Sequence, residues 1–187
     1  MSDPILFVLA VITILATPGP TNTLMATSGA TSGISKSLIL LAAEITGYLT
    51  AILAVHFVLG RVVETYPAVG TALKVAVAIY LAWLAIKLWR RPLLEARERA
   101  VTFGNVYITT LLNPKALIFA LTIIPWSAPG LAWYLLGFAV IVIAAGGGWI
   151  VLGSVVGATS GSRAGYVPRL ASIVLIAFAG IILRAAF

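Results

Sequence analysis

The sequence predicts an all-α integral membrane protein of six transmembrane helices, arranged as two inverted repeats of three helices each. Three observations predict this class: the composition, six long apolar segments, and prolines at matching points of the two halves. Of the 187 residues, 61% are hydrophobic and only 9% are charged. A soluble domain with so few polar side chains could not cover its own surface. We therefore expect a single bilayer-embedded domain, residues 1–187.

Six segments are long and apolar enough to cross a bilayer as helices, which takes about 20 residues each. Short connections rich in turn-forming residues separate them and leave no room for a second domain. The first segment lacks the basic start and small-residue cleavage site of a signal peptide, so we expect it to be retained. The predicted helices are Pro4–Thr27, Ser37–Gly60, Ala68–Trp89, Ala100–Pro125, Leu131–Gly157 and Val167–Ala186.

The first predicted helix contains Thr17-Pro18-Gly19-Pro20 in its middle. Each proline removes a backbone donor and clashes with the preceding turn, and in lipid the freed carbonyl groups need partners from protein or trapped water. We therefore predict that the helix breaks here and lines a cavity. Threonine followed by proline is a common helix start, so we expect Thr17 as N-cap and Pro18 as the next helix's first residue.

The fourth predicted helix repeats this pattern at Asn113-Pro114, with Asn113 as the expected N-cap. Pro18 and Pro114 lie 96 positions apart, and each lies 14 residues beyond the start of its helix. With repeat halves of about 1–95 and 96–187, the second half enters the membrane in the opposite direction. Secondary transporters place broken helices of such repeats around a site near the midplane. A kink filled by packing is the alternative for either proline alone.

Polar residues beside the two breaks are candidates for a substrate site. A half-helix N-terminus offers free N–H groups and a positive dipole end to a carboxylate. Asn22 and Asn113 can cap exposed backbone or bind ligand. Lys115 can extend to the cytoplasm, bind a carboxylate inside, or pair with Glu44. The candidate substrate-binding residues are Thr17, Pro18, Gly19, Pro20, Asn22, Asn113, Pro114 and Lys115.

Glu44 lies about two turns into the second predicted helix, at a depth where an ionisable group is costly and usually faces a polar interior. It can couple transport to protons, receive a substrate ammonium group, or serve as a structural partner of Lys115. His56 lies nearer the outer end of the same helix and is expected to pack, with a proton relay as the alternative. Whether Tyr48 and Tyr80 reach a cavity is left open by the sequence.

The chain has no cysteine and one histidine. Disulfides, thiolate metal sites and a nucleophile–base–acid set therefore cannot be assembled, and no nucleotide-binding loop is present. We predict no metal, no cofactor and no enzymatic activity.

The net charge of +7 could indicate binding to nucleic acid or to anionic lipid, but in a membrane protein the distribution of basic residues between the loops is more informative. Eight basic residues fall on one side of the predicted membrane, whereas Arg61, Lys74 and Arg184 fall on the other. The richer side is expected to be cytoplasmic, which places both termini outside and the loop of residues 90–99 near lipid headgroups. The eight are Lys36, Lys87, Arg90, Arg91, Arg97, Arg99, Arg163 and Arg169.

Glycines crowd the first connection and the fifth predicted helix. Gly29 and Gly33 lie one turn apart, as do Gly153 and Gly157. Small residues at this spacing let helices approach closely, either inside one protomer or between two, and the second arrangement would give a homodimer.

The motifs TPGPTN in the first helix, the Gly29–Gly33 turn, Gly47, and LLNPKALIFALTIIP in the fourth helix resemble the LysE/RhtB family of amino-acid exporters. The resemblance covers nearly the whole chain in length, number of helices and motif position. It implies a small inner-membrane carrier, driven by the proton motive force, that exports amino acids or related metabolites. The family motifs fall on Pro18, Gly19, Pro20, Asn22, Asn113, Pro114 and Lys115.

The chain departs from the family pattern in three places. Trp126-Ser127 follows Pro125, where members often have a glutamine–aromatic pair. Lys36 stands alone in the turn that often carries paired basic residues, and Glu44 is not a general feature of the family. These differences bear on the substrate more than on the fold.

Three function classes stay open. The leading one is a secondary active exporter of amino acids or related small zwitterionic metabolites, with substrate near the midplane between the broken helices. A passive channel would need a continuous pore with charged rings, and only Glu44 and Lys115 are predicted at depth. A non-transporting structural or assembly protein would need neither a substrate site nor a pore.

Overall fold

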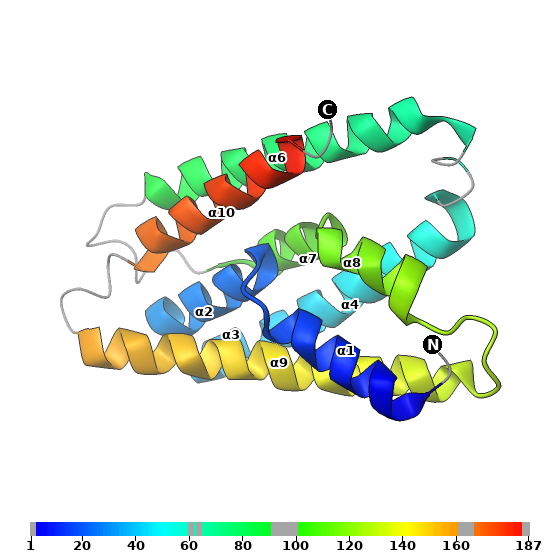
Figure 1. The fold of residues 1–187 in the computed structure, drawn as a ribbon. Helices are drawn as coiled ribbons and strands as arrows, with labels where there is room; N and C mark the ends of the chain where they lie inside the picture. The colour runs from blue at the N-terminus through cyan, green and yellow to red at the C-terminus, as the bar shows by residue number, and fades with distance from the viewer. Residues whose placement is uncertain (1–2, 60–61, 63–64, 91–100, 161–166, 185–187) are drawn as a thin grey trace.

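The computed structural model describes residues 3–59, 62, 65–90, 101–160 and 167–184, and in these ranges the chain is helical with no strand (Figure 1). In each of the six predicted segments the described residues are mainly helical, and the predicted ends at Gly60, Ala100 and Ala186 lie outside the described residues. The elements are α1 Pro4–Ala16, α2 Pro20–Ser32, α3 Ile34–Ser37, α4 Ile39–Ala54, the π-helical η1 Val55–Leu59, α6 Pro67–Trp89, α7 Phe103–Leu111, α8 Pro114–Ile118, the π-helical η2 Phe119–Ile123, α9 Leu131–Ser160 and α10 Val167–Arg184.

Three helical segments of the described chain are long and apolar enough to cross a membrane: Ile34–Val58, Ala68–Lys87 and Leu131–Ala158. Two bent helix pairs raise the number to five if each pair is one span. The sixth predicted helix, α10, has 18 residues and lies beside α6, but it is not among these candidates. The structure is therefore that of a multi-pass membrane protein.

Both predicted breaks are present. The axes of α1 and α2 differ by 62°, and those of α7 and of the segment Pro114–Ile123 differ by 46°. At the second break the local prediction is confirmed, since Asn113 is the N-cap of α8 and its side chain accepts a hydrogen bond from the Lys115 N–H.

At the first break the predicted helix start is wrong. Thr17 is the C-cap of α1, and both its N–H and its hydroxyl donate to the Thr13 carbonyl. The new helix starts two residues later, with Gly19 as N-cap and Pro20 in the first turn. The Thr17 backbone and side chain complete the last turn of α1, and Pro20, two residues after Pro18, supplies the fixed φ with which α2 starts.

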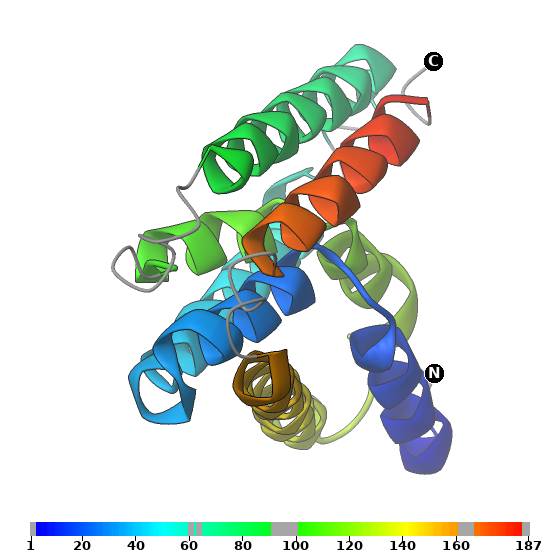
Figure 2. The same cartoon turned by 90° about the vertical axis from the view of Figure 1, so that its left-hand side faces the viewer.

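The helices form two groups on either side of α2, α4 and α7 (Figures 1 and 2). Helices α6 and α10 lie side by side along one edge of the molecule, and α1 and α9 lie along the opposite edge. Helix α2 packs closely against α9. An alanine Cβ at Gly153 would lie 1.9 Å from the Ala26 carbonyl oxygen, and one at Gly29 would lie 2.0 Å from that of Ile150. These glycines thus serve close packing inside one chain.

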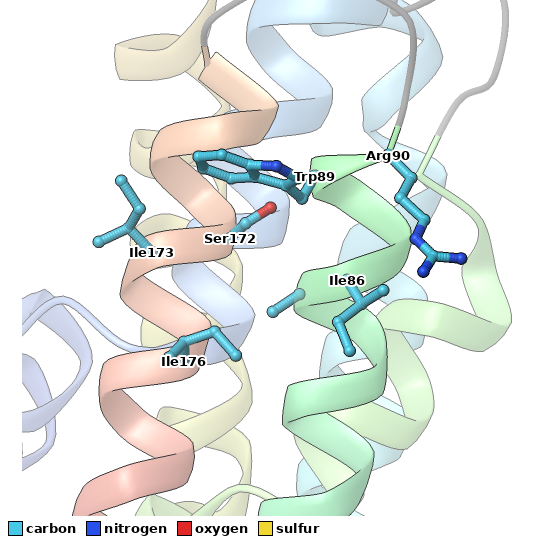
Figure 3. Close-up of a pocket in the computed structure, with 7 residues that line it drawn as sticks. Ile86, Trp89, Arg90, Ser172, Ile173 and Ile176 are labelled. Atoms are coloured by element: carbon cyan, nitrogen blue, oxygen red, sulfur yellow. The ribbon is translucent and has the colours of Figure 1, made fainter.

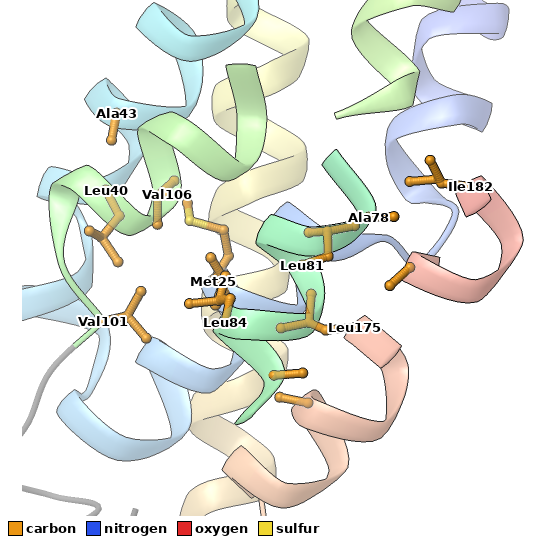
Figure 4. Close-up of a cluster of buried hydrophobic side chains, with 14 of the residues drawn as sticks. Met25, Leu40, Ala43, Ala78, Leu81, Leu84, Val101, Val106, Leu175 and Ile182 are labelled. Carbon is orange, nitrogen blue, oxygen red and sulfur yellow. The ribbon is translucent and has the colours of Figure 1, made fainter. Parts of the chain in front are cut away.

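Two apolar cores fill this arrangement. The first joins α2, α4, α6, α7, α9 and α10, and includes Met25, Leu81, Leu84 and Leu175 (Figure 4). The second joins α1, α4, η1, α8, η2 and α9. Its centre is three aromatic rings, those of Tyr48, Phe119 and Phe138, in edge-to-face contact with centroid distances of 4.9–5.9 Å.

Candidate functional site

A buried polar cluster lies where the two apolar cores meet. On α4, Ala43 belongs to the first core and Tyr48 to the second, and Glu44 lies at the change between them. The two helix breaks, on α1–α2 and on α7–α8, bring further polar residues to the same level. Each exposes 8% or less of its surface. We call this set the break cluster: Thr21, Asn22, Glu44, Thr110, Asn113 and Lys115.

Asn113 joins the two breaks to each other. Its Oδ1 accepts the Lys115 N–H at 3.0 Å, and its Nδ2 donates to Thr21 Oγ1 at 3.0 Å and to the Tyr48 hydroxyl at 3.4 Å. Thr21 Oγ1 lies a further 3.1 Å from Thr110 Oγ1. The first turn of α2, the end of α7, the start of α8 and α4 are thus tied together by hydroxyl and amide groups.

The C-terminal carbonyl groups of α1 attract several donors. Asn22 Nδ2 donates to the Leu15 oxygen at 2.8 Å and to the Thr17 oxygen at 2.9 Å. The Trp149 Nε1–H reaches the Leu15 oxygen at 3.4 Å, and Lys115 Nζ donates to the Thr17 oxygen. Helix carbonyl groups at a C-terminus lack intrahelical partners and carry the negative end of the dipole. The Lys115 side chain is therefore directed into the protein, toward the end of α1.

Glu44 is 1% exposed, and its Oε2 has no hydrogen-bond partner among the residues that the structure describes. Gly146 on α9 makes room for it, because a Cβ at that position would lie 2.1 Å from Oε2. The Glu44 and Lys115 charges interact electrostatically, although the Lys115 ammonium donates to the Thr17 carbonyl and not to Oε2. An unpartnered carboxylate oxygen inside a membrane protein is costly, and such groups mark functional sites.

The two half-helix N-termini are not equivalent. The α8 start is capped by the Asn113 side chain. The α2 start has Gly19 as N-cap with no side-chain hydrogen bond, and its first intrahelical bond runs from the Thr23 N–H to the Gly19 carbonyl. The N–H groups of Thr21 and Asn22 are thus left without a side-chain cap. Gly19 lies against Lys115, since a Cβ there would be 3.2 Å from Nζ.

The remaining predicted residues lie at the edge of the cluster or away from it. Gly19 and Pro20 are buried, and Gly19 lies against Lys115, whereas Thr17 and Pro18 are exposed. His56 stacks on Trp126 with ring centroids 3.6 Å apart and planes 10° apart. It lies about 18 Å along the helix from Glu44, at 1.5 Å per residue. His56 therefore packs at the far end of its helix.

Sequence reasoning missed Thr110 and Gly146 and left Tyr48 undecided. Thr110 lies one turn before Asn113, so the turn preceding a predicted break is a signal that could have found it. Gly146 is the first of three successive glycines, and nothing local distinguishes it from Gly147. Only the register of α9 against α4 places it beside Glu44.

A groove with a volume of about 320 Å³ lies between α6 and α10, lined by Ala85, Ile86, Trp89, Arg90, Ser172, Ile173 and Ile176 (Figure 3). None of the break-cluster residues lines it. Among the described residues no group of three or more His, Cys, Asp or Glu could hold a metal ion. The break cluster is thus the candidate site: a buried set with one acid, one ammonium group and an uncapped helix start.

The chain matches no curated protein sequence and no solved structure. A family model, described as LysE type translocator, matches residues 12–186, nearly the whole chain. The match includes both helix breaks and every residue of the break cluster, and it agrees with the apolar helices in indicating transport across a membrane. The chain belongs to the LysE type translocator family.

Proposed function

We propose that this protein is a secondary active exporter of amino acids or related small zwitterionic metabolites, driven by the proton motive force. Its six helices form two inverted repeats in the cell inner membrane, with both termini outside, and substrate binds near the midplane between the two breaks. The proposed ligands are a small molecule and protons, with lipid around the chain and no cofactor.

One observation carries the proposal: at the first break, a helix C-terminus and a helix N-terminus lie close together beside the buried break cluster. The Thr17 carbonyl, at the end of α1, binds an ammonium group, that of Lys115. The Thr21 and Asn22 N–H groups, at the start of α2, have no side-chain cap and suit a carboxylate. A zwitterion carries these two charged groups a few bonds apart, so it is complementary to both helix ends at once.

Glu44 supplies the proposed coupling group. It is the one acid in the break cluster, and its buried Oε2 accepts no hydrogen bond from the described part of the chain. A carboxyl group can carry a proton across the membrane in one protonation state and interact with Lys115 or substrate in the other. The Glu44→Gln variant keeps a side chain of the same shape, but its amide cannot bind and release a proton.

The test is uptake of radiolabelled amino acids into proteoliposomes, with and without an imposed pH gradient. We expect the parent protein to accumulate at least one amino acid against its concentration gradient only when the pH gradient is present. Glu44→Gln should fold, equilibrate that amino acid, and lose the response to the gradient. A matched control is Asp3→Asn, since Asp3 is exposed at the start of α1 and caps that helix end.

Three outcomes would contradict the proposal. Flux that only ever follows the concentration gradient, at a rate that does not saturate, would indicate a passive channel. No flux of any amino acid would favour a structural or assembly role. Normal coupling in Glu44→Gln would remove Glu44 from the mechanism.

A further inference from the structure

The start of α8 is capped without any contribution from the Lys115 side chain. Asn113 already caps the α8 start, and the Lys115 side chain crosses to the other break, where Nζ donates to the Thr17 carbonyl. The stem passes directly over Gly19, where an added Cβ would lie 3.1 Å from Cε. The residue thus brings a primary ammonium group, on a flexible tether, to the end of α1.

The receiving carbonyl groups form a cation-binding position. They lie at the C-terminal, negative end of α1, and the Thr17 oxygen accepts from Asn22 Nδ2 and from Lys115 Nζ. Two lone pairs are then used by two donors. A third donor can bind that oxygen only if one of the present donors leaves, and Lys115 is the one with a flexible stem.

A second acceptor for Lys115 is already in place. Glu44 Oε2 is buried, no described residue donates a hydrogen bond to it, and the Glu44 charge interacts with that of Lys115. An unpartnered buried carboxylate oxygen is unfavourable, so a donor arriving there is strongly stabilising. The ammonium group therefore has one acceptor it uses, the Thr17 carbonyl, and one it does not, Glu44 Oε2.

We propose that the Lys115 ammonium group occupies the subsite for the substrate's own primary ammonium group, and that substrate displaces it from the Thr17 carbonyl to Glu44. Lys115 acts as a tethered stand-in that keeps the α1 carbonyl groups paired while the site is empty. The proposal rests on the proposed function for the identity of the displacing ligand. The subsite itself takes any small primary ammonium ion.

The proposal predicts which ammonium ligands can bind at the subsite. A ligand must offer N–H donors to replace those of Lys115, so a primary amine competes and a quaternary ammonium ion of the same charge does not. The amine must also approach Gly19 closely, which excludes a bulky substituent on the nitrogen. Lys115 is thus a specificity-determining residue that selects against N-alkylated and N-acylated analogues.

The test uses purified full-length protein in detergent without any amino acid. Lys115→Ala should lower Tm by on the order of 10 °C, because it removes the cation that interacts with the buried Glu44 carboxylate and takes one of two donors from the Thr17 carbonyl group. Ethylammonium chloride should restore at least half of that loss, and tetramethylammonium chloride at equal ionic strength should restore none. In the parent, ethylammonium should act only at higher concentrations, because it must first displace Lys115, and tetramethylammonium should have no effect. Lys36→Ala is the matched control, since Lys36 is exposed and its loss creates no subsite.

A second variant covers the case in which Lys115→Ala does not fold. Glu44→Gln/Lys115→Ala removes the buried charge that the single change leaves unpaired, and ethylammonium should still stabilise it through the Thr17 carbonyl. Equal effects of the two salts, or no effect of either on these variants, would overturn the inference.

The result is separable from that of the transport assay. Stabilisation by ethylammonium alone, with no amino-acid uptake into proteoliposomes, would refute the proposed function and leave the ammonium subsite standing. Uptake of amino acids by a protein whose Lys115 variants ignore ethylammonium would refute the subsite and leave the proposed function standing.

Discussion

At the scale of single residues, the position of the Glu44 side chain depends on Gly146, which faces it from α9. Its carboxylate lies in space that exists because residue 146 has no side chain, with a Cβ-to-Oε2 distance of 2.1 Å if one were added. The Leu41 side chain limits the same space, at 3.0 Å from that Cβ. Any methyl group at this position therefore pushes the carboxylate toward the breaks or deforms α4.

We therefore expect Gly146→Ala to displace the Glu44 carboxylate while leaving the carboxyl group itself in place. Overpacking of this kind costs about 1–3 kcal/mol, and we expect that loss in the free energy of unfolding together with at least a tenfold fall in gradient-driven uptake. Gly147→Ala is the matched control, because a Cβ at Gly147 meets nothing within 4 Å. Equal uptake by the two variants would show that the position of the Glu44 carboxylate does not matter.

At the scale of helices, the first break is held by side chains as well as by prolines. Pro18 is exposed and lies in neither α1 nor α2, whereas Asn22 is 2% exposed and its amide binds two carbonyl groups that α1 leaves open. A bend maintained by Asn22 would persist if Pro18 alone were replaced. The proline motif marks the break, and the amide stabilises it.

We therefore predict different stabilities for two neighbouring variants. Asn22→Ala leaves the Leu15 carbonyl group with only a long bond to Trp149 and should cost about 1–3 kcal/mol of unfolding free energy. Pro18→Ala should change it by less than about 1 kcal/mol, because no backbone partner is lost. Denaturant unfolding followed by circular dichroism measures both. A larger loss in Pro18→Ala would mean that the proline ring is the main support of the bend.

The close contact of α2 with α9 gives the second prediction at this scale. Gly153→Ala places a methyl group 1.9 Å from the backbone oxygen of Ala26, which no rotamer change can relieve, so the helices must separate. We expect a loss of about 1–3 kcal/mol or more, and a lower yield of folded protein. Gly148→Ala on the same helix meets nothing within 4 Å and should stabilise by about 0.5–1 kcal/mol. A shared sign for the two changes would contradict this packing.

How far the sequence predicts the fold also differs by element. Helix positions and the Asn113-Pro114 start are predictable because apolar length and cap chemistry are local. The α2 start is not, because two prolines two residues apart offer two possible helix starts, and the Thr17 and Asn22 hydrogen bonds decide between them. Thr110 and Gly146 join the break cluster only through the register of α7 and α9 against α4, which no local pattern specifies.

At the scale of the whole molecule, the two apolar cores enclose the break cluster from both ends. Helices α4 and α9 contribute to both cores, and each carries a cluster contact between its two apolar stretches, Glu44 on α4 and Gly146 on α9. Polar groups at one level, with apolar packing above and below, are what a midplane site between broken helices requires. The two bends, 62° and 46°, differ in their caps, so any repeat symmetry is approximate.

The orientation of the molecule depends on whether α10 crosses the membrane. Its 18 residues span about 27 Å, close to the hydrocarbon thickness of about 30 Å, and it lies along α6 with Arg169 near one end and Arg184 at the other. We expect it to span, which makes six crossings and places both termini on the same side.

The asymmetry of eight basic residues against three then predicts that this side is outside. An alkaline phosphatase fusion at Phe187 should be active and a fluorescent protein fusion there dark, with the reverse near Glu95. Replacing the basic residues of the loop at 90–99 by glutamine should weaken this preference, whereas the same change at Arg184 should not. A fluorescent C-terminus with a cytoplasmic loop at residue 95 would mean that α10 lies on the membrane surface and that the chain crosses five times.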